Sequence, residues 1–462
     1  MRLLIALGMF VVTAAPLAAQ QQPYVDELPG QGRPIDTAVT AARRTALMTH
    51  LGDAVVLIPA AHEREGEAYG DYPQDTDFRQ HNNFFYVSQL ESEDAWILLN
   101  ARTGGGGDQI LLLPPRNPQQ ERWTGVRVGP DSQAVRLTGF STVLATTSLD
   151  SLIAAARNRH VPFYVEIDPT TREEEVINHL RADTANGLVV RNLRPSVDSM
   201  RVVKDADEIA RLRRAARISA EAHADLMREA QPGMWEYEME AIIEAGFRRR
   251  GADRVGYPSI VGSGINATTL HYDVNRRQSK DGDLVVVDAA AEYGEYTADV
   301  TRTFPINGHF TPRQRAIYDL VLATQQTAMD STRPGMTLIK LNQIARVYMR
   351  EHSGNLCPPG PGETADRTSC DRYMIHGLSH WIGMDVHDVG PYQIPLAPGM
   401  VFTIEPGIYI PSEALGVRIE DDILVTATGY ENLSDAAPRA AADVERLMQS
   451  GRQRAAATRS GR

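Results

Sequence analysis

The chain has 462 residues, too many for one ordinary domain, and two or three domains are expected. Its 42% hydrophobic and 23% charged residues are typical of globular proteins, and beyond the N-terminus no apolar run approaches the about 18 residues of a membrane span. The net charge is −12, and the sequence has no run of basic residues combined with aromatic residues on which bases could stack. Both observations argue against a nucleic-acid partner.

The first 19 residues have the pattern of a secretory signal peptide. Arg2 supplies a positive start, residues 3–14 are apolar, and Ala18 and Ala19 offer small residues for cleavage. The apolar run is short for a membrane span, and the alternative is a buried N-terminal strand or helix. We expect an exported protein, periplasmic or secreted, with no membrane partner after signal removal.

Residues 36–198 alternate helical and β-type patterns, which predicts an N-terminal α/β domain after a polar linker at 20–35. Helices are predicted at 37–50 and 170–183. Strands are predicted at 54–58, NNFFYVSQL, DAWILLN, QILLLP and VPFYVEID. The glycine run at 104–107 predicts a hairpin turn, because no helix follows it as in a phosphate-binding loop.

Residues 199–446 contain one arrangement twice, a pair of helices around Pro-Gly-Met followed by a β-type segment. The predicted pairs are 205–230 with 235–251 and 311–329 with 337–354, and the segments are SIVGSGINATTLHY and YMIHGLSHWIGM. This repetition predicts two α+β halves around a shared central site. The tail at 447–462 is basic and Ala-rich, and we expect it to be disordered.

The two cysteines, Cys357 and Cys370, lie in one Pro/Gly-rich segment, CPPGPGETADRTSC. In an oxidising compartment a disulfide between them would stabilise the fold by about 3 kcal/mol. Two free thiols on a surface loop are the alternative.

Four carboxylates and one histidine lie at the ends of apolar runs in unusual contexts. They are Asp288 in VVVDAA, Asp299 in TADVTRTF, His380 in HGLSHWIG, Glu405 in TIEPGIYI and Glu420 in VRIEDDI. An aspartate after a strand is often only a turn former. If the five meet, however, two divalent cations would balance their charge, whereas each unbalanced pair at about 4 Å would cost about 4 kcal/mol. Asp421 and Asp422 would only solvate a strand end, and we assign them no catalytic role.

Three histidines, His376, His380 and His387, fall within a short glycine-containing stretch, HGLSHWIGMDVHDVG. A lone histidine is more often structural than functional. Three of them interleaved with glycines favour a functional site, and on a strand His376 and His380 would share a face.

The ordered motifs HYDVN, VVDAAAEYGEYTADVTRTF, HGLSHWIGMDVHDVG, APGMVFTIEPGIYI and GVRIEDDILVT resemble those of the proline-specific pita-bread metallopeptidases, the aminopeptidase P and prolidase group. The resemblance covers about 200–445 and extends weakly into the N-terminal domain. It implies an α+β fold, with a C-terminal pita-bread domain of pseudo-two-fold symmetry at 199–446 after an α/β creatinase-type domain at 36–198. SHWIG and ERWTGVRVG look more like aminopeptidase P than prolidase. Two positions depart from the usual pattern of the group. Ala290 lies where these proteins usually have Gly, and Ala298 lies where they usually have Gly or Ser.

The resemblance also implies roles for individual residues. Asp288, Asp299, His380, Glu405 and Glu420 would hold two divalent ions, most readily Mn²⁺ but also Co²⁺, Fe²⁺ or Zn²⁺, with Asp299 and Glu420 bridging. A hydroxide between the ions would attack the substrate, and Glu405 would also accept and transfer the proton. His271, His376 and His387 would line the substrate pocket and steady the carbonyl and the tetrahedral intermediate. Arg418 would support the metal-bound carboxylates or the substrate, and Tyr409 is a weaker candidate for the pocket.

We therefore predict an exported Xaa-Pro aminopeptidase acting on peptides with proline in second position. A prolidase restricted to Xaa-Pro dipeptides is the nearest alternative. A metal-free creatinase-like hydrolase and a non-catalytic pita-bread binding protein are disfavoured by the intact ligand set. Relatives commonly assemble, so we expect a homodimer or homotetramer.

Overall fold

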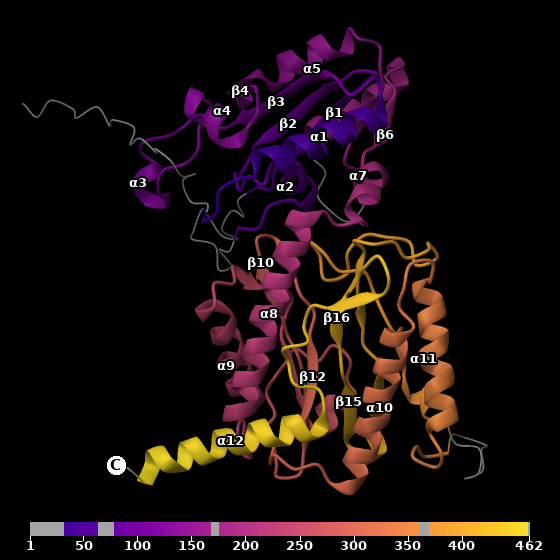
Figure 1. Cartoon of the computed structure of the whole chain (residues 1–462). Coiled ribbons are helices and arrows are strands. Elements are labelled where there is room, and N and C mark those ends of the chain that lie inside the picture. Colours follow the sequence, from indigo (N-terminus) through magenta and orange to yellow (C-terminus); the bar gives the residue numbers. More distant parts are fainter. Residues whose placement is uncertain (1–31, 63–77, 168–174, 360–368, 461–462) are drawn as a thin grey trace, which may run out of the picture. The chain divides into compact units, whose positions relative to one another are not determined.

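We describe the fold from a computed structural model, whose described residues are 32–62, 78–167, 175–359 and 369–460 (Figure 1). The chain forms two compact units, Met1–Asn192 and Leu193–Arg462, so the division lies slightly before the predicted boundary at 198. The predicted signal peptide at 1–19 and most of the linker at 20–35 lie outside the described residues. Among the described helices, none has the length and apolar character needed to cross a membrane.

The N-terminal unit contains a six-stranded sheet in the order β4-β3-β2-β1-β5-β6. Its strands are β1 (Ala54–Pro59), β2 (Trp96–Ala101), β3 (Gly107–Leu113), β4 (Thr142–Ala145), β5 (Phe163–Val165) and β6 (Val190–Asn192). β2 and β3 form the predicted antiparallel hairpin, whose turn contains Gly104 and Gly105 at φ +91° and +83°. These left-handed angles suit glycine, because it has no Cβ to clash with the backbone.

The helices of this unit are α1 (Thr37–Leu51), α2 (Asn82–Ser88), α3 (Glu121–Thr124), α4 (Ser132–Thr138), α5 (Leu149–Arg157) and α6 (Glu175–Ala182). The prediction of a strand at NNFFYVSQL was wrong, because these residues form α2. Its apolar residues are all buried, and a short apolar run does not distinguish a buried helix from a buried strand. The helix ends at Gln89, which has left-handed backbone angles.

The C-terminal unit contains the predicted repetition of helix pairs. Its helices are α7 (Arg194–Arg201), α8 (Ala206–Glu229), α9 (Glu236–Arg249), α10 (Pro312–Asp330), α11 (Leu338–His352) and α12 (Ala441–Ser460). The Pro-Gly-Met turns have matching geometry, with Gly233 at φ +90° and Gly335 at φ +89°. Each glycine N–H also donates to a distant carbonyl, that of Ser279 or Leu396. The two turns are therefore structural equivalents.

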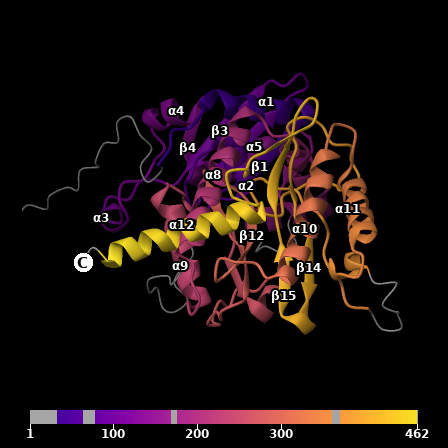
Figure 2. The ribbon, with the colours of Figure 1, turned by 60° about the horizontal axis from the view of Figure 1, so that its bottom comes forward.

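Helix α12 includes residues 447–460, for which the sequence analysis predicted a disordered tail. Val444 and Met448, one helical turn apart, are buried in a cluster with residues of α8 and α9. Apolar packing of this face favours the helix. Figures 1 and 2 show α12 in yellow, with its C-terminal half extending beyond α8 and α9.

Small sheets lie between the helix pairs. The strands are β7 (Arg254–Val255), β8 (Ile260–Ser263), β9 (Leu284–Asp288), β10 (Ala291–Tyr293), β11 (Tyr296–Thr297), β12 (Thr301–Pro305), β13 (Val401–Ile404), β14 (Gly407–Ile410), β15 (Leu415–Arg418), β16 (Asp421–Val425) and β17 (Tyr430–Asn432). They form the sheets β12-β9-β8, β13-β16-β17, β11-β10-β7 and β14-β15.

The strand predicted at YMIHGLSHWIGM was wrong. This segment is irregular and makes one isolated bridge, between Trp381 and Phe402. It nevertheless runs alongside β13, because the N–H groups of Thr403 and Glu405 donate to the carbonyls of His380 and Leu378. The glycines in the segment weaken regular strand structure.

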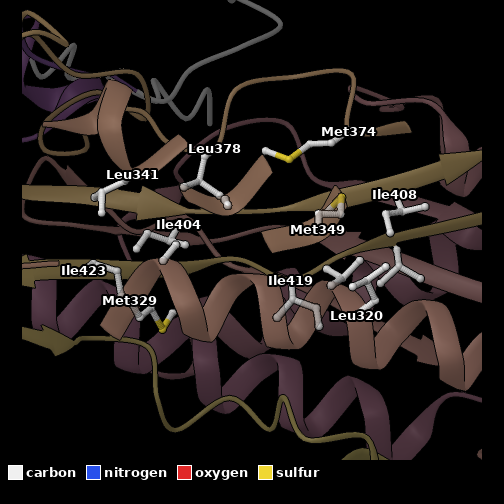
Figure 3. Packing of buried hydrophobic residues seen from close by; sticks show 14 of the residues in the cluster. Leu320, Met329, Leu341, Met349, Met374, Leu378, Ile404, Ile408, Ile419 and Ile423 are labelled. Carbon is white, nitrogen blue, oxygen red and sulfur yellow. The ribbon is translucent and has the colours of Figure 1, made fainter. Parts of the chain in front are cut away.

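Each helix pair has its own apolar core. Residues of α8 and α9 pack on β8, β9 and β12. Residues of α10 and α11 pack on β13–β16, as Figure 3 shows for Met329, Leu341, Ile404 and Ile423. The second core also contains a buried disulfide between Cys357 and Cys370, so the alternative of two free thiols is excluded. The α+β fold with two related halves is confirmed.

Candidate active site

A pocket of about 580 Å³ in the C-terminal unit contains nearly all of the predicted site residues. Its lining includes Asp288, Asp299, His380, Glu405, Glu420, His271, His376, His387 and Arg418. Tyr409 lies one contact further back, with its hydroxyl at His376 and Arg418. The lining also includes residues that sequence analysis missed, among them Tyr257, Ile260, Leu270, Asp273, Ser379, Val386 and Tyr392.

Both halves of the unit deliver carboxylates to this pocket through paired strands. Asp288 is the last residue of β9 and pairs with Thr301 of β12, two residues after Asp299. Glu405 follows β13, and Glu420 precedes β16, its antiparallel partner. In an antiparallel pair the end of one strand lies beside the start of the next. Each pair therefore presents two carboxylates at one edge.

His380 lies among three of the carboxylates. Its Nε2 atom is 3.2 Å from Asp299 Oδ2, 3.5 Å from Glu405 Oε1 and 3.8 Å from Glu420 Oε1. Its Nδ1 atom lies 3.1 Å from the carbonyl oxygen of Trp381, which can only accept a hydrogen bond. This contact places a proton on Nδ1, so that in the neutral ring the lone pair of Nε2 faces the carboxylates.

Asp299, Glu405 and Glu420 are buried together, and this burial raises their pKa values, with repulsion among the carboxylates adding to it. Burial, supported by the charge of Asp288, raises the pKa of Asp299. Burial likewise raises the pKa of Glu405 to about 8 and that of Glu420 well above its ordinary value. The pKa of His380 rises to about 9, because contact with Asp299 and the charge of Glu405 outweigh burial. The cluster therefore attracts positive charge.

Comparison with known proteins agrees with this arrangement. Residues 210–427 match the model of metallopeptidase family M24, and residues 40–164 match that of the aminopeptidase P N-terminal domain. The Xaa-Pro aminopeptidase of Escherichia coli K12 is 35% identical over 438 residues, covering 89% of this chain and 97% of the relative. This chain belongs to metallopeptidase family M24. Its resemblance to the Xaa-Pro aminopeptidase group is confirmed, and it is a metallo-aminopeptidase.

Further relatives extend along most of the chain. Human Xaa-Pro aminopeptidase 3 is 31% identical over 391 residues, covering 80% of this chain and 76% of the relative. The structure of E. coli aminopeptidase P with the inhibitor Pro-Leu has a TM-score of 0.82 at 34% identity, covering 91% of this chain and 100% of that one. That of proline aminopeptidase P II from Yersinia pestis has a TM-score of 0.80 at 34% identity, covering 90% and 100%.

The donor set fits the divalent ions on which family M24 depends. Ligand atoms of Asp299, His380 and Glu420 all lie within 4.8 Å of one another. Carboxylate oxygens with one imidazole nitrogen suit hard or borderline divalent ions. The Tyr257 hydroxyl lies 2.6 Å from Asp288 Oδ1 and 2.5 Å from Asp299 Oδ1, yet it has a single proton to donate. A cation would satisfy the oxygen that this proton leaves unpaired.

A chain of hydrogen bonds connects Asp288 to His376. Arg418 donates from Nη2 to Asp288 Oδ2 at 2.7 Å and from Nη1 to the Tyr409 oxygen at 3.0 Å. The Tyr409 hydroxyl lies 2.8 Å from His376 Nε2, and His376 Nδ1 lies 2.7 Å from the carbonyl of Gly377. Burial and the charge of Arg418 lower the pKa of His376 to about 4, so its ring is neutral and accepts from Tyr409. His271 and His387 are more exposed.

Asp421 and Asp422 do not solvate a strand end, and that interpretation was wrong. Both are fully buried behind the site. Asp421 Oδ1 accepts from Arg302 Nη2 at 2.6 Å, and the carboxylate of Asp422 accepts from the N–H of Asp299 at 3.2 Å. They support, from behind, the strands that bring the carboxylates to the pocket. The sequence alone did not show that the β16 strand is covered on both faces.

Proposed function

We propose that this chain is an exported Xaa-Pro aminopeptidase, which removes the N-terminal residue from peptides with proline in second position. The main support is that five ligand-type side chains and three further histidines meet in one pocket of a metallo-aminopeptidase. Relatives along most of its length are named Xaa-Pro aminopeptidases.

In this proposal Asp288, Asp299, His380, Glu405 and Glu420 would hold two divalent ions. The oxygen-rich set suits Mn²⁺ better than it suits a structural zinc ion, which favours thiolates. When bound, the two ions would supply a hydroxide nucleophile near neutral pH and polarise the scissile carbonyl.

Glu405 is proposed to accept a proton from the attacking water and to pass it to the departing proline nitrogen. That nitrogen must be protonated as it leaves, which requires an acid nearby. The Glu405 carboxylate faces two imidazoles, with Oε1 3.5 Å from His380 Nε2 and Oε2 3.6 Å from His376 Nδ1. These neighbours keep its oxygens within the pocket.

The substrate is proposed to lie along His271, His376 and His387, of which His271 and His387 would steady the carbonyl oxygen. An Xaa-Pro bond has no N–H, so the pocket needs no acceptor at that point. Ile260, Leu270 and Val386 give the same pocket an apolar side. A pyrrolidine ring would bury apolar surface there.

A peptide-length series tests this function. Protein stripped of metal and reloaded with Mn²⁺ is assayed on Xaa-Pro, Xaa-Pro-Yaa and Xaa-Pro-Yaa-Zaa, and we expect cleavage of the longer peptides. Glu405→Gln should lower kcat by about 10²–10⁴-fold, whereas Glu413→Gln, the same change at an exposed residue, should not. Activity on the dipeptide alone would identify a prolidase instead. Absence of both stoichiometric metal and Mn²⁺-dependent hydrolysis would contradict the proposal.

Export to the periplasm is supported by the pattern at 1–19 and by the disulfide, a bond that persists in oxidising compartments. Cell fractionation of the full chain, with a variant lacking residues 2–19 as control, tests it. We also propose a homodimer or homotetramer, which light scattering would distinguish from a monomer.

A further inference from the structure

Next to the pocket, Asp388 is buried between two cations from a distant part of the chain. Its side chain is 1% exposed and accepts from Lys204 Nζ at 3.0 Å and from Arg201 Nη2 at 2.5 Å. Arg201 ends α7, and Lys204 lies just before α8. A buried carboxylate needs such partners, and two of them hold it in a defined place.

The identity of Lys204 is unusual for this chain. The sequence contains three lysines, at 204, 280 and 340, and uses arginine at nearly every other basic position. Lys204 is buried, while Lys280 and Lys340 are exposed. A slender stem ending in a compact charge fits where a guanidinium would need more room. The fit is tight, because a Cβ added at Gly383 would lie 3.1 Å from Lys204 Cε.

Asp388 closes a short loop, residues 384–390, that carries His387. The N–H of Asp388 donates to the carbonyl of Trp381 at 2.9 Å. Its carboxylate packs so closely on Gly383 that a Cβ there would lie 2.0 Å from Oδ2. The loop is therefore fixed to the segment 381–383, which directly follows His380. Motion of the Asp388 carboxylate would therefore displace both the loop 384–390 and the segment 381–383.

The residue before Asp388 is the pocket histidine His387. Its ring lies 4.4 Å from the ring of His380 at an interplanar angle of 75°. His387 is exposed on the pocket side, so local packing does little to hold it. Its placement therefore depends on the loop, and the loop is held at Asp388.

We propose that Asp388, held by Lys204 and Arg201, is a positioning residue that fixes the imidazole of His387 beside His380 for contact with substrate. This inference rests on the proposed peptidase function, in which His387 steadies the substrate carbonyl. A displacement of about 1 Å at such a group lowers turnover by up to about 100-fold.

A double-mutant cycle tests the proposal. Lys204→Met retains the aliphatic stem, removes one of the two cations and leaves Asp388 paired with Arg201. Against an Xaa-Pro tripeptide with Mn²⁺, we expect it to lower kcat about tenfold or more, with little change in KM or metal content. In a His387→Ala background the same substitution should lower kcat less than about twofold, because the residue acts through His387. Lys340→Met is the matched control and should have no effect in either background.

A second readout separates failure of this inference from failure of the proposed function. In protein with ¹⁵N-labelled histidines, Lys204→Met should shift or broaden the His387 imidazole signal, assigned with His387→Ala, and leave the His223 signal unchanged. Equal losses of kcat in both backgrounds, no loss in either, or an unchanged His387 signal would overturn the inference. If the unmodified enzyme cleaves no Xaa-Pro peptide, the proposed function is wrong, and the imidazole signal still tests the positioning of His387.

If urea unfolding shows that Lys204→Met is not folded, Arg201→Gln replaces it and leaves Asp388 paired with Lys204.

Discussion

The two halves of the C-terminal unit place different side chains at one equivalent position behind the site. His223 in α8 and Gln325 in α10 each lie nine residues before the proline of their Pro-Gly-Met turn. The His223 Nε2–H donates to the carbonyl of Ala289 at 2.9 Å. Gln325 Nε2 lies 3.0 Å from the carbonyl of Ile404, 3.1 Å from that of Ile419 and 3.0 Å from Asp421 Oδ2.

The two side chains hold different numbers of partners. Ala289 adjoins the predicted ligand Asp288, and one N–H reaches it. In the second half, Ile404 and Ile419 adjoin Glu405 and Glu420, and a single amide reaches both. The two halves therefore use the same helix position to hold residues next to the pocket carboxylates, with one hydrogen bond in the first half and three in the second.

The largest expected effect comes from removing the amide in the second half. Gln325→Leu leaves three buried acceptors without their shared donor, and it should lower the free energy of unfolding by about 4 kcal/mol. Urea unfolding of metal-free protein measures this. Gln326→Leu is the control on the same helix, because Gln326 makes an exposed contact with Asp330. Equal destabilisation by both variants would show that Gln325 has no special role.

The disulfide belongs to the second half alone, so breaking it should distinguish the halves further. The Cys357→Ser, Cys370→Ser double variant should lose about 3 kcal/mol of stability through the larger entropy of its unfolded chain. Hydrogen exchange should increase first in the core of α10 and α11, which contains both cysteines. Faster exchange in α8 and α9 to the same extent would contradict this local effect.

The histidine in the first half predicts a pH dependence that the glutamine cannot give. Burial lowers the pKa of His223 to about 4, below its ordinary 6.5. Between these two pH values the unfolded chain therefore binds a proton at His223 that the folded chain does not. The contribution of neutral His223 to the free energy of unfolding is complete above pH 6.5 and falls as the pH decreases towards 4. Metal-free His223→Gln should lose about 2–3 kcal/mol less than the parent between these pH values. Parallel unfolding curves would refute this.

The smallest effect should be the same in both halves. Gly233→Ala and Gly335→Ala each place a Cβ on a left-handed residue, where no atom lies within 4 Å of it. The cost comes from the backbone angle alone and should be about 1–2 kcal/mol for each. Thermal unfolding measures both. A large difference between them would mean that the turns are not equivalent.

Sequence patterns predicted which acidic side chains line the pocket, because each of these carboxylates lies at the end of an apolar run. Helix pairs with repeated turns were also predictable, because periodicity and glycine act locally. The strand at NNFFYVSQL was mispredicted because burial on all sides removes periodicity. Tyr257, Gln325 and Asp388 were missed because their roles depend on partners 31–187 residues away. A pattern of neighbouring residues cannot predict contacts across such long sequence separations.

The packing of α12 has a consequence for the order of folding. This last helix returns to α8, the first long helix of the unit, and a Cβ at Gly451 would lie 2.0 Å from the carbonyl oxygen of Arg228. Contacts between helices so far apart in the sequence form slowly, and this one can form only after α12 has been synthesised. The N-terminal sheet can form while synthesis continues. The core that α12 shares with α8 and α9 is therefore complete only once α12 has been synthesised.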